Sequence, residues 1–106
     1  MPDTPDRPPP SRTVRVLVAE DHALVRQGIQ LLLEAAGGFE VVEETALGAQ
    51  VPGLVEMHRP DLLLLDLALS DCSGIEVARK VRKAHPALRI LVVTGNVYPG
   101  SIDQSI

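Results

Sequence analysis

The sequence predicts an α/β fold in which helices cover a doubly wound parallel sheet. Short apolar segments alternate with segments whose apolar residues recur at helical spacing, and this alternation is typical of parallel sheets. One segment, Leu62 to Leu65, consists of four consecutive leucines, as expected of a strand that is buried on both faces. In open sheets of this kind, ligands bind at the carboxyl ends of the strands.

The length and amino-acid composition indicate a small single domain and argue against several classes of protein. The 106 residues suffice for one domain, and one Phe and one Tyr with no Trp predict a small aliphatic core. A formal net charge of −4 argues against a nonspecific nucleic-acid surface. The single cysteine, Cys72, excludes an internal disulfide, and no apolar run reaches transmembrane length. We therefore expect a cytoplasmic protein that does not enter membranes.

The chain begins with a proline-rich segment, residues 1–13, which we interpret as a disordered leader. The first strand is predicted over Val14–Ala19, where β-branched residues are frequent. A first helix is predicted over Ala23–Ala36, and the pair Gly37-Gly38 supplies its stop. The apolar residues of this helix that recur at helical spacing are Leu24, Val25, Ile29, Leu31, Leu32 and Ala35.

The middle of the chain predicts two strands separated by a helix. Phe39–Glu44 reads as a more polar strand, which places it nearer an edge of the sheet. A short helix is predicted over Gln50–His58, with Pro52 in its first turn. The segment Arg59–Asp66 contains the leucine run, and this unbroken apolar run after Pro60 is predicted to be a central strand.

A third helix is predicted to begin at Ser73, because Ser73 and Glu76 have the spacing of a capping box, and to stop before Pro86. A fourth strand is predicted over Arg89–Thr94, and Ser101–Ile106 has the pattern of the first turns of a fourth helix. The residues of the third helix that we expect to point inward are Val77, Ala78, Val81 and Ala84.

Polar side chains follow three of the predicted strands. Glu20 and Asp21 come after the first, Asp66 ends the third and Thr94 ends the fourth. Since parallel strands bring their carboxyl ends to one edge, we expect these side chains to converge. Carboxylates in one pocket repel unless a cation is present, and oxygen ligands of this kind suit Mg²⁺. A carboxylate beside Mg²⁺ is able to attack phosphorus, and Thr94 would donate to a phosphoryl oxygen.

Each of these residues taken alone has a simpler explanation. Glu20 and Asp21 would serve equally to cap the first helix, and Asp66 would serve to cap a turn. Threonine is frequent in strands, so Thr94 by itself indicates little. Only the joint placement of the four residues favours phosphoryl chemistry.

From Val14 to about Ile106 the sequence resembles the receiver domain of two-component response regulators. The matching segments are Val16 to His22, Pro60 to Leu67 with Gly74 at the family's offset, and Leu91 to Gly95. The segment Asp21 to Gly28 is most similar to regulators whose output is a helix-turn-helix DNA-binding domain. The resemblance implies a flavodoxin-like fold, of which this chain carries four of the usual five strands.

The resemblance also implies roles for single residues. Asp66 would accept a phosphoryl group from a sensor histidine kinase, and Thr94 would be the switch hydroxyl that follows that group. Glu20 and Asp21 would form the Mg²⁺ pocket with Asp66, and the backbone carbonyl of Ala68 would be a further ligand. The protein would then be a signalling phosphoprotein rather than an enzyme. It would reach DNA only through an output domain that this chain lacks.

Two departures from the family pattern affect these expectations. Leu69-Ser70 replaces the usual Met-Pro after the acceptor, which we expect to alter loop rigidity more than chemistry. Residues 14–106 are interpreted as a receiver domain truncated within its fourth helix, so the strand that carries the family's lysine is missing. Without that lysine, we expect phosphorylation from a small donor to be slow or undetectable.

Two other hypotheses remain open. A receiver-like interaction module would bind a partner through its incomplete edge without being phosphorylated, because the lysine is absent. In either case the uncovered fourth strand, Arg89–Thr94, is expected to favour self-association. An unrelated enzyme or nucleotide binder of similar fold is disfavoured, because Ala19 to His22 contains no glycine-rich phosphate loop.

Overall fold

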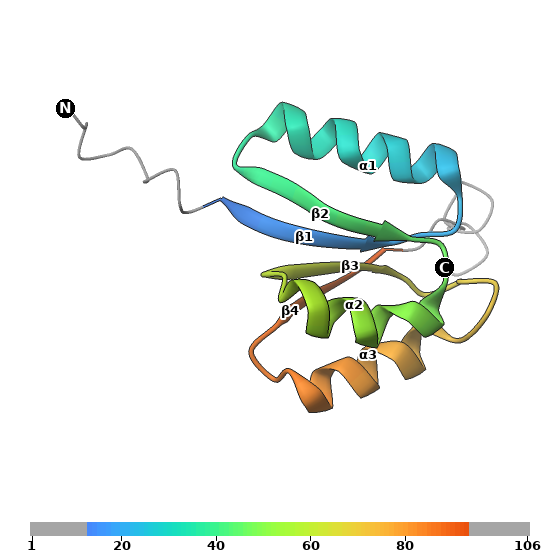
Figure 1. Ribbon diagram of the computed structural model, residues 1–106. Helices are drawn as coiled ribbons and strands as arrows, with labels where there is room; N and C mark the ends of the chain where they lie inside the picture. Colours follow the sequence, from blue (N-terminus) through green and yellow to red (C-terminus); the bar gives the residue numbers. More distant parts are fainter. Residues whose placement is uncertain (1–12, 94–106) are drawn as a thin grey trace, which may run out of the picture.

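The computed structural model describes residues 13–93, which form a four-stranded sheet with helices on both faces (Figure 1). The strands are β1 (Val14–Ala19), β2 (Phe39–Thr45), β3 (Leu62–Asp66) and β4 (Arg89–Val93). The helices are α1 (Ala23–Ala36), the short 3₁₀ helix η2 (Gly48–Gln50), α2 (Val51–His58) and α3 (Gly74–Ala84). Over the described residues, the predicted order of strands and helices is confirmed.

All strands of this sheet are parallel, and their order is β2-β1-β3-β4. The leucine-rich β3 is central and the more polar β2 lies at an edge, as their compositions predicted. The register places Ala19 beside Leu65 and Asp66 beside Val93. Residues that follow β1 and β3 therefore meet at one edge of the sheet.

The central strands bury side chains on both of their faces, because successive residues of a strand point in opposite directions. On one face, Ile29 and Leu33 of α1 pack against Val16, Val18 and Leu64. Figure 1 shows α1 on this side of the sheet and α2 and α3 together on the other side. The second face holds more of the core, namely Leu17, Ala19, Leu63 and Leu65 from the sheet with Val51, Val55, Val77 and Val81 from α2 and α3.

Local signals set the helix ends. Gly37 and Gly38 have φ angles of 77° and 82°, in the left-handed region that favours glycine, and they end α1. Ser73 is the N-cap of α3, and its hydroxyl accepts a hydrogen bond from the Glu76 amide at 3.5 Å. Pro52 lies in the first turn of α2, where its missing N–H costs nothing.

Arg59 and Pro60, which precede the leucine run, lie outside the strand, as the prediction of a strand after the proline requires. Arg59 adopts the left-handed conformation, with a φ angle of 47°, and its amide donates to the Val55 carbonyl, so it closes α2. Asp61 then anchors the turn, because its Oδ2 accepts from the Arg15 amide at 2.9 Å. The strand itself begins at Leu62.

The apolar pattern of α1 is wider than its buried face. The helix contacts the sheet along the line of Ile29 and Leu33, one turn apart, so three of its leucines are exposed: Leu24 (80%), Leu31 (66%) and Leu32 (72%). The prediction that Ala84 points inward is also wrong. Ala84 is exposed because it is the last residue of α3, and Val81 completes the buried face one turn earlier.

Several predictions fall outside the described residues. These are the leader before Thr13, the predicted switch residue Thr94 and the predicted fourth helix over Ser101–Ile106. Among the helices within residues 13–93, none combines the length and hydropathy needed to cross a bilayer.

Candidate metal centre

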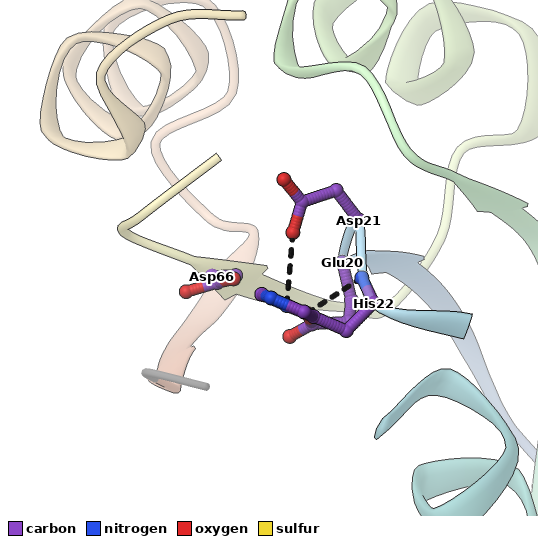
Figure 2. A group of neighbouring side chains, drawn as sticks. All are labelled: Glu20, Asp21, His22 and Asp66. Atoms are coloured by element: carbon purple, nitrogen blue, oxygen red, sulfur yellow. Dashed lines mark hydrogen bonds and ion pairs between the residues drawn. The ribbon is translucent and has the colours of Figure 1, made fainter. Parts of the chain in front are cut away.

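The carboxyl ends of β1 and β3 bring three carboxylates together (Figure 2). Glu20 and Asp66 are both fully buried, and the Asp21 side chain is 15% exposed. One ligand atom from each of these acids and one from His22 all lie within 4.8 Å of one another. The structure therefore brings together three of the four predicted side chains, while Thr94 is not among the described residues.

Glu20 presents one carboxylate oxygen that has no hydrogen-bond donor. Its Oε2 accepts from the His22 backbone amide at 3.0 Å and lies 2.7 Å from His22 Nδ1. Its Oε1 is buried and has no hydrogen-bond partner within residues 13–93. Because a buried charge is costly unless it is paired, this oxygen is a natural ligand for a cation.

Asp21 is held from two sides. Its Oδ2 accepts a hydrogen bond from the Ser70 backbone amide at 3.0 Å, across 49 positions of sequence. Its Oδ1 lies 3.0 Å from His22 Nδ1, close enough for an ion pair although it is not aligned as a hydrogen bond. The alternative in which Glu20 and Asp21 cap α1 is met only in part. Glu20 accepts from the amide of the N-cap residue His22, whereas Asp21 accepts from Ser70, and the His22 side chain itself makes no capping hydrogen bond.

Asp66 combines the two roles that its sequence position left open. Its Oδ1 accepts from the Ala68 amide at 3.0 Å, so the carboxylate does cap the turn after β3. The same bond orients the carboxylate at the acidic edge. Gly74 allows the turn to pack closely, because a Cβ there would lie 2.5 Å from the Leu67 Cα and 2.6 Å from the Asp66 carbonyl oxygen. Whether the Ala68 carbonyl is a metal ligand stays a prediction.

His22 is a member of the cluster that the sequence analysis did not identify. Figure 2 shows its ring lying among the side chains of Glu20, Asp21 and Asp66. The hydrogen bond to Glu20 raises the pKa of His22, and the negative charge of Asp21 adds to this effect. The only sequence signal was adjacency to two acids, which does not tell where an imidazole ring points.

Two further residues support the site without belonging to it. Arg26 in α1 donates from Nη1 to the Glu20 backbone carbonyl at 2.6 Å, which ties the first turn of the helix to the end of β1. Asp71 accepts from the amides of Gly48 and Ala49 at 2.8 and 3.0 Å, which ties the loop after β3 to η2. These two hydrogen bonds lower the pKa of Asp71. Neither tie was predicted.

Comparisons with known proteins agree on a single family. The family model described as the response regulator receiver domain matches residues 16–104. The response regulator protein VraR of Staphylococcus aureus is 35% identical over 82 residues, which are 77% of this chain and 39% of VraR. This chain therefore spans well under half the length of that curated relative.

Solved structures show the same likeness. A two-component response regulator of the LuxR family from Aurantimonas sp. aligns with a TM-score of 0.74 and 32% identity, over 88% of this chain and 66% of that one. A signal receiver domain from Mycobacterium tuberculosis, assigned to NarL, aligns with a TM-score of 0.74 and 34% identity, over 89% of this chain and 76% of that one. The flavodoxin-like fold predicted from the sequence is thereby confirmed.

Proposed function

Because the chain belongs to the response regulator receiver domain family, we propose that it accepts a phosphoryl group on Asp66 from a sensor histidine kinase. One observation carries the proposal. Asp66 ends the central strand β3, fully buried, with its carboxylate beside those of Glu20 and Asp21. Of the three acids, Asp66 is the one that belongs to the central strand itself, and it lies at the carboxyl edge, where ligands bind in sheets of this type.

The residues present fit a bound Mg²⁺. Glu20, Asp21 and Asp66 offer only oxygen ligands, and Glu20 Oε1 is buried without a hydrogen-bond donor within residues 13–93. The carbonyl of Ala68 would be a further ligand. Mg²⁺, when bound, supplies positive charge that offsets the charges of the three carboxylates and of the incoming phosphoryl oxygens.

In the transfer step, a carboxylate oxygen of Asp66 attacks phosphorus and the bond from phosphorus to the donor breaks. With a phosphohistidine donor, the electron pair of the P–N bond returns to the imidazole, and an acyl phosphate forms on Asp66. The Ala68 amide, which donates to Asp66 Oδ1, keeps the carboxylate oriented during the attack. Thr94 would donate to a phosphoryl oxygen once the group is in place. The protein is thus a phosphoryl acceptor in a phosphorelay and not an enzyme in its own right.

The wider role that we propose is cytoplasmic signal transduction that ends in transcription control. The support is the likeness to response regulators of the LuxR family, one of which, from Staphylococcus aureus, is described as DNA-binding and aligns at 28% identity. DNA contact would require an output domain beyond the receiver fold.

Labelling with acetyl phosphate tests the proposal. The 106-residue chain would be incubated with excess donor and Mg²⁺, and the intact mass measured. We expect a slow, Mg²⁺-dependent gain of one phosphoryl group that hydroxylamine removes. Asp66→Asn should abolish the gain, whereas Asp61→Asn should retain it, because Asp61 binds Arg15 at the other end of β3. If the unsubstituted chain gains no mass at any time point, the proposal is wrong and the interaction-module hypothesis replaces it.

A further inference from the structure

The two ends of the described sheet carry opposite charge. At the β2 end, Glu43 and Glu44 line a hollow of about 490 Å³, and we call this the acidic edge. At the β4 end, Arg82 of α3 and Arg89 of β4 line a hollow of about 570 Å³, and we call this the basic edge. Since β2 and β4 are separated by the two central strands, one molecule presents both surfaces at once.

The acidic edge has one carboxylate on each face of the sheet. Glu43 lies 3.7 Å from His58 of α2, so it belongs to the face that α2 and α3 cover. Glu44 lies 3.6 Å from Arg26 of α1, so it belongs to the opposite face. Their side chains are 43% and 31% exposed, which leaves both carboxylates accessible to a partner.

The basic edge repeats this arrangement with the opposite sign. Arg82 belongs to α3 and therefore to the face covered by α2 and α3. Arg89 is aligned with Leu62, which packs on the α1 face, and aligned residues of neighbouring strands point to the same face. Arg82 donates to backbone carbonyls, and neither arginine pairs with a carboxylate within residues 13–93. Their charges are thus left for a partner to neutralise.

The strand registers bring the opposite charges to nearby levels. Leu62 is aligned with both Arg89 and Val16. Two residues later in β1, Val18 is aligned with Glu44. If the sheet of one copy continued into the next at the same level, Arg89 and Glu44 would therefore be offset along the strands by roughly 7 Å. An arginine side chain is long enough to cover this offset.

Apolar side chains accompany the charges at both edges. On β4, Leu91 and Val92 are 54% and 44% exposed. At the acidic edge, Leu54 and Met57 of α2 line the hollow, and Met57 is 73% exposed. A contact between the two edges would remove these side chains from water while it pairs the charges.

We propose that copies of this chain associate head to tail, with the basic edge of one copy against the acidic edge of the next. In this arrangement β4 and β2 extend one parallel sheet, because all strands already run in the same direction. Arg89 meets Glu44 on the α1 face, and Arg82 meets Glu43 on the other. The inference goes beyond phosphoryl transfer and does not depend on it.

The charges select this contact over a symmetric one. A two-fold contact between two basic edges would place Arg82 and Arg89 of both copies along one seam with no carboxylate, and such like-charge contacts are costly. A head-to-tail contact instead uses two different surfaces. It leaves one acidic and one basic edge open, so it builds linear assemblies or rings rather than a closed dimer.

Charge reversal at the two edges tests the proposal by sedimentation of the 106-residue chain at low salt. Arg89→Glu and Glu44→Arg should each weaken self-association roughly tenfold, because each places like charges across the contact. An equimolar mixture of the two variants should restore association, since each variant then meets an opposite charge on the other. Added salt should weaken association of the unsubstituted chain.

Glu76→Arg is the matched control, because it makes the same change of charge as Glu44→Arg in the hollow between α2 and α3, away from both edges. It should leave association unchanged. Restoration in the mixture also shows that both variants are folded, and circular dichroism of each checks this independently. An unsubstituted chain that stays monomeric, association that folded Glu44→Arg leaves unchanged, or folded variants that fail to associate when mixed would overturn the inference.

Discussion

The backbone amide of Ser70 donates a hydrogen bond to Asp21 Oδ2 at 3.0 Å, joining the loop after β3 to the acidic edge at the end of β1. A backbone donor is unaffected by most substitutions at its own position, and only proline removes it. Ser70 stands where the receiver pattern usually has proline, so this tie depends on a departure from that pattern.

Ser70→Pro should therefore destabilise the folded chain. Hydrogen bonds to charged groups contribute about 1.5–3 kcal/mol, while the reduced freedom of the unfolded chain returns only about 0.4–1 kcal/mol. We expect a net loss of about 1 kcal/mol in the free energy of unfolding, measured by urea denaturation. Ser70→Ala keeps the amide and is the control. Equal stability of the proline and alanine variants would show that the bond contributes nothing.

Gly74 is predicted to be intolerant of even one added carbon. A Cβ at this position would lie 2.5 Å from the Leu67 Cα and 2.6 Å from the Asp66 carbonyl oxygen, and both contacts are with backbone that cannot rotate away. Gly74→Ala should cost about 1–3 kcal/mol of stability, as overpacking typically does.

Gly28→Ala is the matched control for this prediction. Gly28 lies inside α1, and a methyl group at this position would meet nothing within 4 Å, so alanine should stabilise the helix by up to about 1 kcal/mol. Thermal unfolding of both variants should show shifts of opposite sign. A neutral Gly74→Ala would mean that the turn after Asp66 adapts more freely than the packing indicates.

Because of Asp71, the free energy of unfolding should decrease when the pH is lowered into the acid range. The amides of Ala49 and Gly48 lower the pKa of Asp71, so the folded state holds this carboxylate ionised more strongly than the unfolded state does. Its stabilising contribution is complete above the pKa of an unfolded aspartate. It is lost as pH falls through the lowered pKa of the folded state.

The stability difference between the unsubstituted chain and Asp71→Asn should consequently be larger at neutral pH than in acid. Urea denaturation at a series of pH values measures it. Glu34→Gln, which removes an exposed carboxyl from α1, is the control and should show no such convergence. A difference that is independent of pH would contradict the role given to the Asp71 carboxylate.

The outer side of β4 is predicted to favour self-association. Within residues 13–93, β4 lies at the end of the sheet, and its Leu91 and Val92 are 54% and 44% exposed. An apolar strand of this kind, with one unpaired side, is a template for another chain. Sedimentation of the 106-residue chain should show concentration-dependent oligomers, which Leu91→Lys should reduce.

Leu31→Lys serves as the comparison, because Leu31 is 66% exposed on α1 rather than on a strand edge. It should leave the oligomers in place. A chain that sediments as a monomer at all concentrations would rule out this use of β4.

Much of the fold follows from sequence periodicity. A run of four leucines is long enough for a strand and has no polar face, so β3 had to be covered on both sides, and this is what placed it in the centre. Once the strands are parallel, Glu20, Asp21 and Asp66 must share one edge. The spacing of apolar residues and the alternation of strands with helices can both be read from the sequence. They suffice to predict that β3 is central and that the three acids share one edge of the sheet.

Contacts between distant loops needed the tertiary structure. The Ser70 amide reaches Asp21 across 49 positions, and Asp71 reaches Gly48 across 23, through backbone groups whose directions no residue type specifies. The same holds for His22, whose backbone is extended at the start of α1 and whose ring lies against Glu20, because the residue type does not specify that direction. The exposure of Leu32 was likewise decided by which line of α1 meets the sheet. Sequence alone determined which acids share an edge, whereas packing decided which donors hold them there, because hydrogen-bond geometry depends on how loops that are far apart in sequence are brought together.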